Sequence, residues 1–233
     1  MLKSEGRVVM VTGASRGIGA AIAQRLHDAG YTLSLGARDP ATLPIGESAR
    51  VMHGRFDAVD KPSHMAWVAA TAERFGRIDA LVNNAGMAGR LNIEEDDDDL
   101  LDEVWAVNVK APLSMIRLCL PHLRACGSGR IVNVASLSGK RVRNDNVAYS
   151  MSKFAVMALT HSARRIAWED GVRATALCPS FVATDMTADV TKVGRAEMID
   201  AADLAELAAT VIALPNTASI AELLVNCRLE DTL

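Results

Sequence analysis

Short apolar runs alternate with longer amphipathic segments along the chain, and this alternation constrains the fold more than any other feature of the sequence. The apolar runs predict strands at Arg7–Thr12, Thr32–Gly36, Arg50–Gly54, Ile78–Asn83, Arg130–Ala135, Val172–Cys178 and Glu222–Cys227. The amphipathic segments predict helices at Ile18–Ala29, Pro62–Phe75, Leu100–Ala125, Tyr149–Glu169 and Ala201–Leu214. Because strands that alternate with helices form a parallel sheet covered on both faces, we expect an α/β fold with a doubly wound parallel sheet of about seven strands flanked by helices.

Composition and charge exclude several classes of protein. With 233 residues, 50% of them hydrophobic, the chain suits one compact domain over residues 1–233. Its 25 basic and 28 acidic side chains give a net charge of −3, so the electrostatic signature of nucleic-acid or anionic-membrane binding is missing. No apolar run reaches the roughly 18 residues that span a bilayer. The N-terminus lacks the long apolar stretch of a signal peptide.

The cysteines and histidines favour neither disulfides nor a metal site. The four cysteines form no Cys-x-x-Cys pair, and Cys119 and Cys178 lie within apolar patterns that favour buried thiols. The five histidines are scattered along the chain. We therefore expect no metal in catalysis and a reducing, cytoplasmic location.

A glycine-rich turn follows the first predicted strand and opens the first helix. Residues 12–19 read Thr-Gly-Ala-Ser-Arg-Gly-Ile-Gly. Glycines permit a tight turn and a close approach of the backbone to a pyrophosphate, and the helix N-terminus offers N–H groups and the positive end of its dipole. The spacing differs from the G-x-G-x-x-G fingerprint and lacks the G-K-[ST] ending of a P-loop. The turn predicts a dinucleotide phosphate site, with a plain strand-to-helix turn as the alternative.

Two further motifs lie where chemistry is expected. Residues 83–86 read Asn-Asn-Ala-Gly at the end of the fourth predicted strand, where ligands of open parallel sheets bind; a simple Asn-rich turn is the alternative. Tyr149 and Lys153 are spaced i, i+4, which places them on one face of a helix. A nearby ammonium stabilises a phenolate and lowers its pKa from about 10, so this pair suits a general acid/base, with an ordinary surface pair as the alternative.

In this order the three motifs resemble the short-chain dehydrogenase/reductase family, and the resemblance extends from about Arg7 to Cys227. It implies a single-domain Rossmann fold and hydride transfer between a nicotinamide cofactor and a carbonyl or secondary alcohol. It also implies a catalytic set that consists of Asn108, Ser136, Tyr149 and Lys153. Ser138 competes for the serine position, but Ser136 has the family-like spacing to Tyr149.

The resemblance gives each member of the catalytic set a role. Tyr149 gives its proton to the developing alkoxide, and Ser136 hydrogen-bonds the substrate oxygen. Lys153 lowers the pKa of Tyr149 and binds the nicotinamide ribose hydroxyls. Asn108 holds a water that links Lys153 to bulk solvent.

The same resemblance implies a cofactor site assembled from several loops. Its residues are Gly13, Ser15, Arg16, Gly17, Ile18, Gly19, Arg38, Asp57, Ala58, Asn84, Ala85, Gly86, Tyr149, Lys153, Pro179 and Thr184. Asp57 and Ala58 flank the adenine, whereas Pro179 and Thr184 approach the nicotinamide and the phosphate. Ser180 stands where the family usually has glycine.

The end of the second predicted strand favours NADP(H). An acidic residue there accepts hydrogen bonds from the ribose 2′-hydroxyl of NAD, whereas arginine accommodates a 2′-phosphate. Ala37 occupies the position at which NAD-preferring relatives usually have Asp, and Arg38 and Arg16 would clamp the phosphate. The alternative is two solvated arginines, one of them paired with Asp39.

The sequence leaves the substrate open. Arg141 and Arg143 would attract an anionic substrate, whereas the acidic run Glu94–Asp99 would favour a cationic or neutral one. Both features are also typical of solvated surfaces. We expect a small carbonyl or alcohol, neither nucleic acid nor membrane as partner, and, by the resemblance, a homo-oligomer (dimer or tetramer) formed through the helices near strands four and five.

Two other functions compete with an enzyme of this kind. A non-catalytic NADP(H)-sensing regulatory protein would use the same fold, but it has less need of a complete proton relay. Isomerase or dehydratase chemistry on a nucleotide-sugar is disfavoured, because the short C-terminal region leaves little room for a sugar-binding domain.

Overall fold

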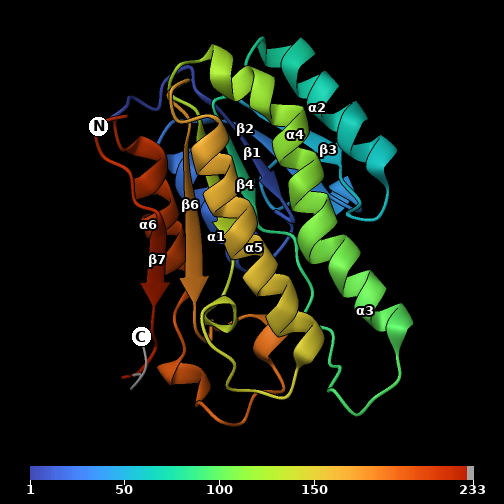
Figure 1. The fold of residues 1–233 in the computed structure, drawn as a ribbon. Helices are drawn as coiled ribbons and strands as arrows, with labels where there is room; N and C mark the ends of the chain where they lie inside the picture. Colours follow the sequence, from blue (N-terminus) through green and yellow to red (C-terminus); the bar gives the residue numbers. More distant parts are fainter. Residues whose placement is uncertain (230–233) are drawn as a thin grey trace.

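Seven parallel strands form one sheet in the computed structural model, which describes residues 1–229 (Figure 1). In chain order they are β1 Val8–Thr12, β2 Thr32–Ala37, β3 Val51–Arg55, β4 Ala80–Asn83, β5 Arg130–Val134, β6 Arg173–Pro179 and β7 Glu222–Val225. Across the sheet the order is β3-β2-β1-β4-β5-β6-β7. The chain winds outward in one direction from β1 and in the other from β4, which confirms the predicted doubly wound sheet.

Helices cover both faces of the sheet. They are α1 Gly17–Asp28, α2 Lys61–Phe75, α3 Asp98–Trp105, α4 Ala111–Ala125, α5 Val147–Ile166 and α6 Ala201–Ala213. Successive residues of β1 point to opposite faces: Val9 and Val11 pack in the core with α1 and α6, whereas Met10 packs in the core with α2, α4 and α5. Strands buried on both faces carry apolar residues at nearly every position, which is why short apolar runs predicted them.

The predicted helix Leu100–Ala125 is broken in the structure. Five residues of π-helix, Ala106–Lys110, separate α3 from α4, and Pro112 stands at the start of α4. Proline lacks the N–H that an α-helix would direct at the carbonyl of Asn108, four residues earlier, so the break lies where regular α geometry is unavailable. α4 then continues through Pro121 to its predicted end.

The bounds of α5 and of the last strand also differ from the prediction. The side chain of Asn146 caps α5 by accepting a hydrogen bond from Tyr149 N at 3.1 Å, so the helix begins at Val147 rather than at Tyr149. It ends at Ile166 rather than at Glu169. The last strand ends at Val225 rather than at Cys227, since the Cys227 N–H donates to the Ser180 hydroxyl (2.8 Å) instead of continuing the ladder.

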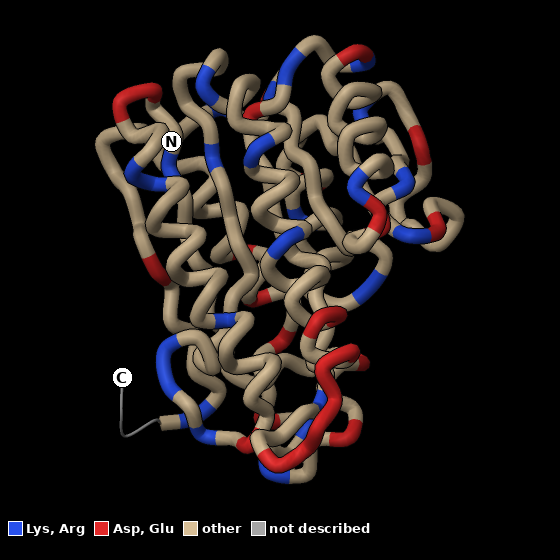
Figure 2. Tube along the Cα trace, turned by 45° about the vertical axis from the view of Figure 1, so that its right-hand side comes forward, with Lys and Arg blue, Asp and Glu red and all other residues tan. Residues whose placement is uncertain are grey.

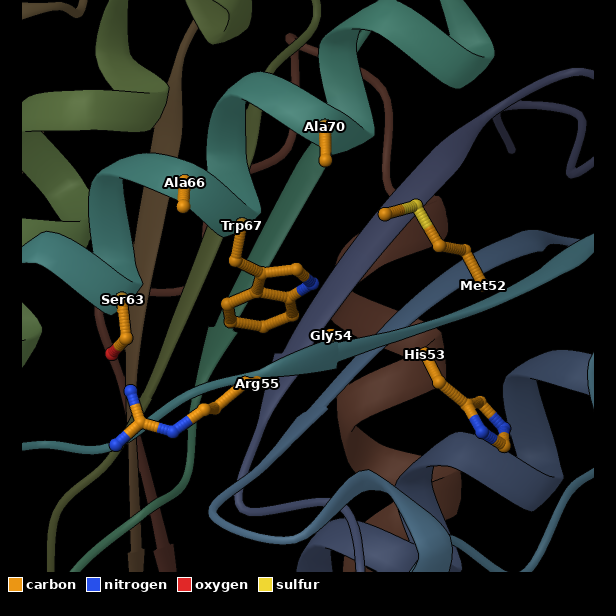
Figure 3. Close-up of a pocket in the computed structure, with 8 residues that line it drawn as sticks. All are labelled: Met52, His53, Gly54, Arg55, Ser63, Ala66, Trp67 and Ala70. Carbon is orange, nitrogen blue, oxygen red and sulfur yellow. The ribbon is translucent and has the colours of Figure 1, made fainter.

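The indole of Trp67 occupies the space between α2 and the edge of the sheet (Figure 3). A Cβ at Gly36 would lie 2.5 Å from this ring, and a Cβ at Gly54 would overlap it. Trp67 Nε1 donates to the Ser34 hydroxyl at 2.8 Å, so the buried indole is satisfied. A hollow of about 310 Å³ remains beside the indole, on β3. Because β2 and β1 separate β3 from β4, this hollow is remote from the Asn84–Gly86 turn.

The cysteine side chains behave as the sequence predicts. All four are free thiols, and Cys119 and Cys178 are buried. Burial raises the pKa of each of these two thiols to about 12. Among residues 1–229, the helices fall short of the length and apolar character that crossing a membrane requires.

Candidate active site

The motifs identified in the sequence meet at one edge of the sheet, where the carboxyl ends of the parallel strands lie. The glycine-rich turn follows β1, and the Asn84–Gly86 turn follows β4. These two strands are neighbours, although the segments of chain that follow them lead to opposite sides of the sheet. Such a reversal opens a crevice at the strand ends, and open α/β sheets bind their ligands there.

The two turns touch so closely that only glycine fits. A Cβ at Gly13 would lie 2.9 Å from Ala85 Cα, and Gly13 has a φ of +64°. A Cβ at Gly19 would overlap both Gly13 O and Asn84 Nδ2. Gly17, with φ +55°, faces Thr184: its Cβ would lie 3.3 Å from Thr184 Cγ2. The missing side chains bring three separate loops into one cradle.

Thr12 joins the turns by hydrogen bonds. Its hydroxyl accepts from the backbone N–H groups of Asn84 (2.9 Å) and Ala85 (3.1 Å). In return, Asn84 Nδ2 donates to the carbonyl oxygens of Thr12 (3.1 Å) and Gly13 (3.0 Å). As the last residue of a predicted strand, Thr12 gave no sign of this role, although it stands first in the glycine motif.

The N-terminus of α1 suits a phosphate group. Its N-cap residue is Arg16, and within residues 1–229 no side chain caps this helix and no acidic residue stands in its first turn. The first N–H groups of the helix and the positive end of its dipole therefore face the cradle. No acidic side chain in the first turn of α1 competes with a phosphate for these N–H groups. A pyrophosphate fits the chemistry of this end.

Ser136, rather than Ser138, is paired with Tyr149. The Ser136 hydroxyl interacts with the Tyr149 phenol and lowers its pKa. Ser136 Oγ also accepts from Ser138 N (3.1 Å) and makes a long contact of 3.5 Å to Pro179 O. The hydroxyl of Ser138 instead accepts from Asn144 Nδ2 at 3.4 Å. Of the two candidate serines, the structure brings Ser136 to the tyrosine.

Lys153 is buried one helical turn after Tyr149. Its Nζ lies 5.4 Å from the centroid of the Tyr149 ring and donates to Val134 O at 3.0 Å. Burial lowers the pKa of Lys153 to about 8. The ammonium is thus held at the end of β5, between the tyrosine and the Asn84–Gly86 turn, where Gly86 leaves room for it.

The expectation that Lys153 lowers the pKa of Tyr149 is not met in this arrangement. Burial raises the pKa of Tyr149 above its usual value, and the hydrogen bond with Ser136 opposes the rise only in part. The physical reason is that Lys153 Nζ is directed at Val134 O, while the phenol lies in a desolvated position. The tyrosine is a neutral proton donor in this state.

Asn108 is buried in the π-helical break and faces inward. Its side-chain amide pairs with Met87: Oδ1 accepts from Met87 N and Nδ2 donates to Met87 O, both at 2.9 Å. The side chain is not solvent-facing, and it reaches the residue that follows the Asn84–Gly86 turn. A π-bulge inside a helix frequently marks a functional site.

Arg16 and Arg38 are both exposed, and Arg16 forms an ion pair with Asp185 at 3.4 Å. Among residues 1–229, the Asp39 carboxylate pairs with neither arginine. It instead accepts a hydrogen bond from Ala41 N at 3.0 Å. Arg38 directly follows β2 and Arg16 belongs to the turn after β1, so both residues stand at the carboxyl edge of the sheet. This geometry leaves both of them accessible to a phosphate.

Pro179, Thr184 and Ser180 line the opposite side of the cradle. The carbonyl of Pro179 contacts Ser136, and Thr184 faces Gly17. Ser180 needs no glycine-like backbone, since all positive φ angles in residues 1–229 belong to glycines. Its hydroxyl accepts from Cys227 N, and this bond ties the end of β6 to the end of β7.

The predicted adenine-flanking residues, Asp57 and Ala58, follow β3, and His64 holds them. His64 Nε2 donates to Asp57 O at 2.8 Å, so Nδ1 is the acceptor for the Ser114 hydroxyl at 3.0 Å. The imidazole stacks on Phe56 with ring centroids 4.8 Å apart. Burial lowers the pKa of His64, partly offset by Asp57 and Asp60 and reinforced by Lys61.

This lowered pKa predicts a loss of stability in acid. The unfolded chain binds a proton at His64 at higher pH than the folded chain, so the contribution is complete above the usual histidine pKa of about 6.5 and is lost as the pH falls below it. Urea unfolding from pH 7 to 5 is expected to show a declining free energy of unfolding. The decline should be shallower in His64→Gln and unchanged in His122→Gln, a partly exposed histidine on α4. Equal slopes in all three proteins would contradict the prediction.

The charged segments near the site have structural partners. The run Glu94–Asp99 lies at the end of the molecule where the strands end (Figure 2). Asp97 caps α3 by accepting from Leu100 N at 2.9 Å, and Asp98 and Asp99 occupy its first turn. The run therefore stabilises a helix N-terminus. Arg141 and Arg143 lie in the loop between Ser136 and Tyr149 and also have interaction partners.

Comparison with known proteins agrees with this geometry. A family model described as short chain dehydrogenase matches residues 7–193. An agropine synthesis reductase from Rhizobium rhizogenes is 44% identical over 228 residues, covering 96% of this chain and 53% of that protein. The chain thus spans about half the length of this curated relative.

Solved structures share the whole fold. The chain is similar to a 3-ketoacyl-(acyl-carrier-protein) reductase from Brucella melitensis complexed with NADH, with TM-score 0.87, 28% identity, and coverage of 96% of this chain and 98% of that one. It is also similar to a metagenomic short-chain oxidoreductase in complex with NADP, with TM-score 0.81, 31% identity, and coverage of 98% and 100%. Both similarities extend over almost the whole chain.

Proposed function

The chain belongs to the short-chain dehydrogenase family, and from this premise we propose that it is an NADP(H)-dependent oxidoreductase that interconverts a carbonyl and a secondary alcohol, with Tyr149 as general acid/base. One observation carries the proposal: the glycine cradle and the Ser136–Tyr149–Lys153 group lie at the same edge of the sheet. The N-terminus of α1 would hold the phosphates of a dinucleotide, and Lys153 would bind its nicotinamide ribose. Gly13, Gly17, Gly19 and the Asn84–Gly86 turn would hold the dinucleotide.

The residues of the chain supply the proton chemistry. A bound reduced nicotinamide supplies a hydride for the carbonyl carbon. Tyr149 donates its proton to the carbonyl oxygen, so that C=O becomes CH–OH, and the hydroxyl of Ser136 stabilises the resulting phenolate. Ser136 can turn its proton from the long contact with Pro179 O toward the substrate oxygen. Oxidation reverses these steps.

Lys153 has a second task in this proposal. With a pKa lowered to about 8 it still carries its positive charge at neutral pH. Its Nζ lies near Gly86, where the absent side chain opens the turn to a sugar hydroxyl. We assign it to the nicotinamide ribose, and we assign Asn108 to a water that links Lys153 with solvent.

We infer the direction of the reaction and the cellular location of the protein from two separate observations. The Rhizobium and Brucella relatives are both named reductases, which favours carbonyl reduction in this chain. The four free thiols favour a reducing compartment, and we place the protein in the cytoplasm on that ground.

A substrate panel tests the function. The purified chain is mixed with NADPH and a set of ketones and aldehydes, and with NADP and the corresponding alcohols, while the absorbance of the reduced nicotinamide is followed. Turnover of at least one carbonyl is expected. Tight NADPH binding without turnover of any compound would favour the non-catalytic, NADP(H)-sensing alternative.

Arg38→Asp is expected to shift the cofactor preference toward NAD(H). A charge-assisted contact to the 2′-phosphate contributes about 1.5–3 kcal/mol, so NADPH affinity should fall by roughly 10- to 100-fold while NADH affinity is kept or rises. Fluorescence titration of both cofactors measures this ratio. Arg50→Asp, which removes an exposed arginine before β3, is the matched control. An unchanged NADPH affinity in Arg38→Asp would exclude the arginine clamp.

We also propose that the chain self-associates through α3 and α5. A groove of about 870 Å³ there is lined by apolar side chains, among them Trp105, Val147 and Phe154, and also by polar and acidic ones. Met151 and Phe154 are 46% and 43% exposed, which is unusual for large apolar side chains on one helix face. A second copy related by a twofold axis would bury the same face of both chains.

Phe154→Arg is expected to weaken this self-association by at least about tenfold, because it places a charge in the centre of the buried patch. Sedimentation velocity over a concentration series measures the change. Met65→Arg replaces a similarly exposed apolar residue on α2 and should leave the association state as in the wild type. Identical behaviour of both variants would contradict the assignment of this face.

A further inference from the structure

Ser152 lies between Tyr149 and Lys153 on α5 and is completely buried. Its hydroxyl donates to Tyr149 O at 2.7 Å and accepts from Asn108 Nδ2 at 3.0 Å. The sequence alone gives no sign of a role for Ser152, because a serine within a helix usually bonds its own backbone. Here the Ser152 hydroxyl also contacts Asn108, which belongs to the π-helical segment between α3 and α4.

The contact with Ser152 satisfies the second N–H of the Asn108 amide. One N–H of Nδ2 binds Met87 O and the other binds Ser152 Oγ, while Oδ1 accepts from Met87 N. Both N–H donors of this buried side chain are therefore used, and Oδ1 keeps a second lone pair for a further donor. Without the serine hydroxyl one buried N–H would be orphaned, and the amide would lose its fixed orientation.

Gly86 lies next to both Asn108 and Lys153, so the orientation of the Asn108 amide affects the surroundings of Lys153. A Cβ at Gly86 would lie 3.3 Å from Asn108 Oδ1 and 3.8 Å from Lys153 Nζ. Gly86 thus packs between the amide and the ammonium. Because Asn108 sits in the π-helical break, regular helix geometry does not hold it in place, and its side-chain partners must do so.

We propose that Ser152 is a positioning residue for the reaction: it orients Asn108, and through Asn108 it sets the separation between Lys153 and the Asn84–Gly86 turn. The inference rests on the proposed function. It assigns to Ser152 a geometric role without contact with substrate or cofactor.

Ser152→Ala tests the role by kinetics. We expect kcat to fall roughly fivefold to thirtyfold, while KM for the carbonyl and the dissociation constant for NADPH stay within about twofold. Ser152→Thr keeps the hydroxyl and should recover most of the rate. Ser150→Ala is the matched control: Ser150 is 3% exposed on the same helix, and its hydroxyl binds Asn144. Equal kcat values for Ser152→Ala and the wild type would overturn the proposal.

A double-mutant cycle tests whether Ser152 acts through Asn108. In an Asn108→Ala background the further change Ser152→Ala should lower kcat by less than about twofold. If the two substitutions multiply their effects, Ser152 acts by another route and the proposal is wrong.

Hydrogen exchange at the Met87 amide gives a readout that needs no turnover. This N–H donates to Asn108 Oδ1, so Ser152→Ala should speed its exchange by at least about tenfold, whereas Ser150→Ala should not. If the wild type turns over no substrate, the proposed function fails and the exchange data still decide whether Ser152 orients Asn108. If the wild type is active and Met87 exchange is unchanged in Ser152→Ala, the inference fails and the function stands.

Discussion

Replacing Tyr149 with phenylalanine is expected to lower kcat by roughly 10²- to 10⁴-fold while NADPH binding stays within about threefold. Phenylalanine keeps the ring but lacks the hydroxyl that is paired with Ser136. Burial makes this phenol a neutral donor, so its proton is available to a carbonyl oxygen, and no water replaces it efficiently in a desolvated position. Steady-state kinetics with the best substrate of the panel measure the loss.

Tyr31→Phe provides the matched control. Tyr31 is the other tyrosine of the chain, is 2% exposed, and precedes the amino end of β2, at the opposite edge of the sheet from the site. Its substitution should leave kcat at the wild-type value. If Tyr149→Phe turned over at the rate of Tyr31→Phe, Tyr149 would not be the proton donor and the proposed mechanism would be abandoned.

Gly19→Ala is expected to reduce NADPH affinity by at least about 100-fold. The added Cβ would overlap Gly13 O and Asn84 Nδ2, which belong to backbone and to a side chain held by two hydrogen bonds. Neither atom can retreat without opening the contact between the glycine turn and the Asn84–Gly86 turn. Overpacking of this kind costs about 1–3 kcal/mol of stability, and the distorted cradle loses its fit to a pyrophosphate.

Gly46→Ala is the control for a glycine outside the cradle. Nothing lies within 4 Å of a Cβ placed at Gly46, and its φ is not in the left-handed region. This substitution should leave cofactor affinity unchanged and alter stability by less than about 1 kcal/mol. Thermal unfolding and NADPH titration of both variants separate damage to the cradle from a general effect of replacing glycine. Wild-type affinity in Gly19→Ala would show that the cradle does not hold the cofactor.

Local pattern was sufficient for the sheet and for the place of the site. The apolar runs predicted every strand because a parallel sheet buries both faces of its strands. Strands of this kind therefore consist almost entirely of apolar residues, which the sequence shows directly. The position of the glycine turn after β1 and of the Asn-rich turn after β4 then placed both motifs at one edge, since parallel strands share their carboxyl ends. The choice of Ser136 over Ser138 rested on the family resemblance, which supplied the expected spacing to Tyr149.

Properties that depend on contacts between distant segments required the structure. The chain by itself predicted one helix over Leu100–Ala125 and a Lys153 that lowers the pKa of Tyr149. The structure instead shows a π-helical break at Asn108 and a phenol whose pKa is raised by burial. Periodicity records which face of a segment is apolar, but the direction of a side chain such as Lys153 depends on the carbonyl of Val134, which another strand provides. Desolvation and hydrogen-bond partners such as Ser152 arise only when separate elements pack, so tertiary structure alone decides them.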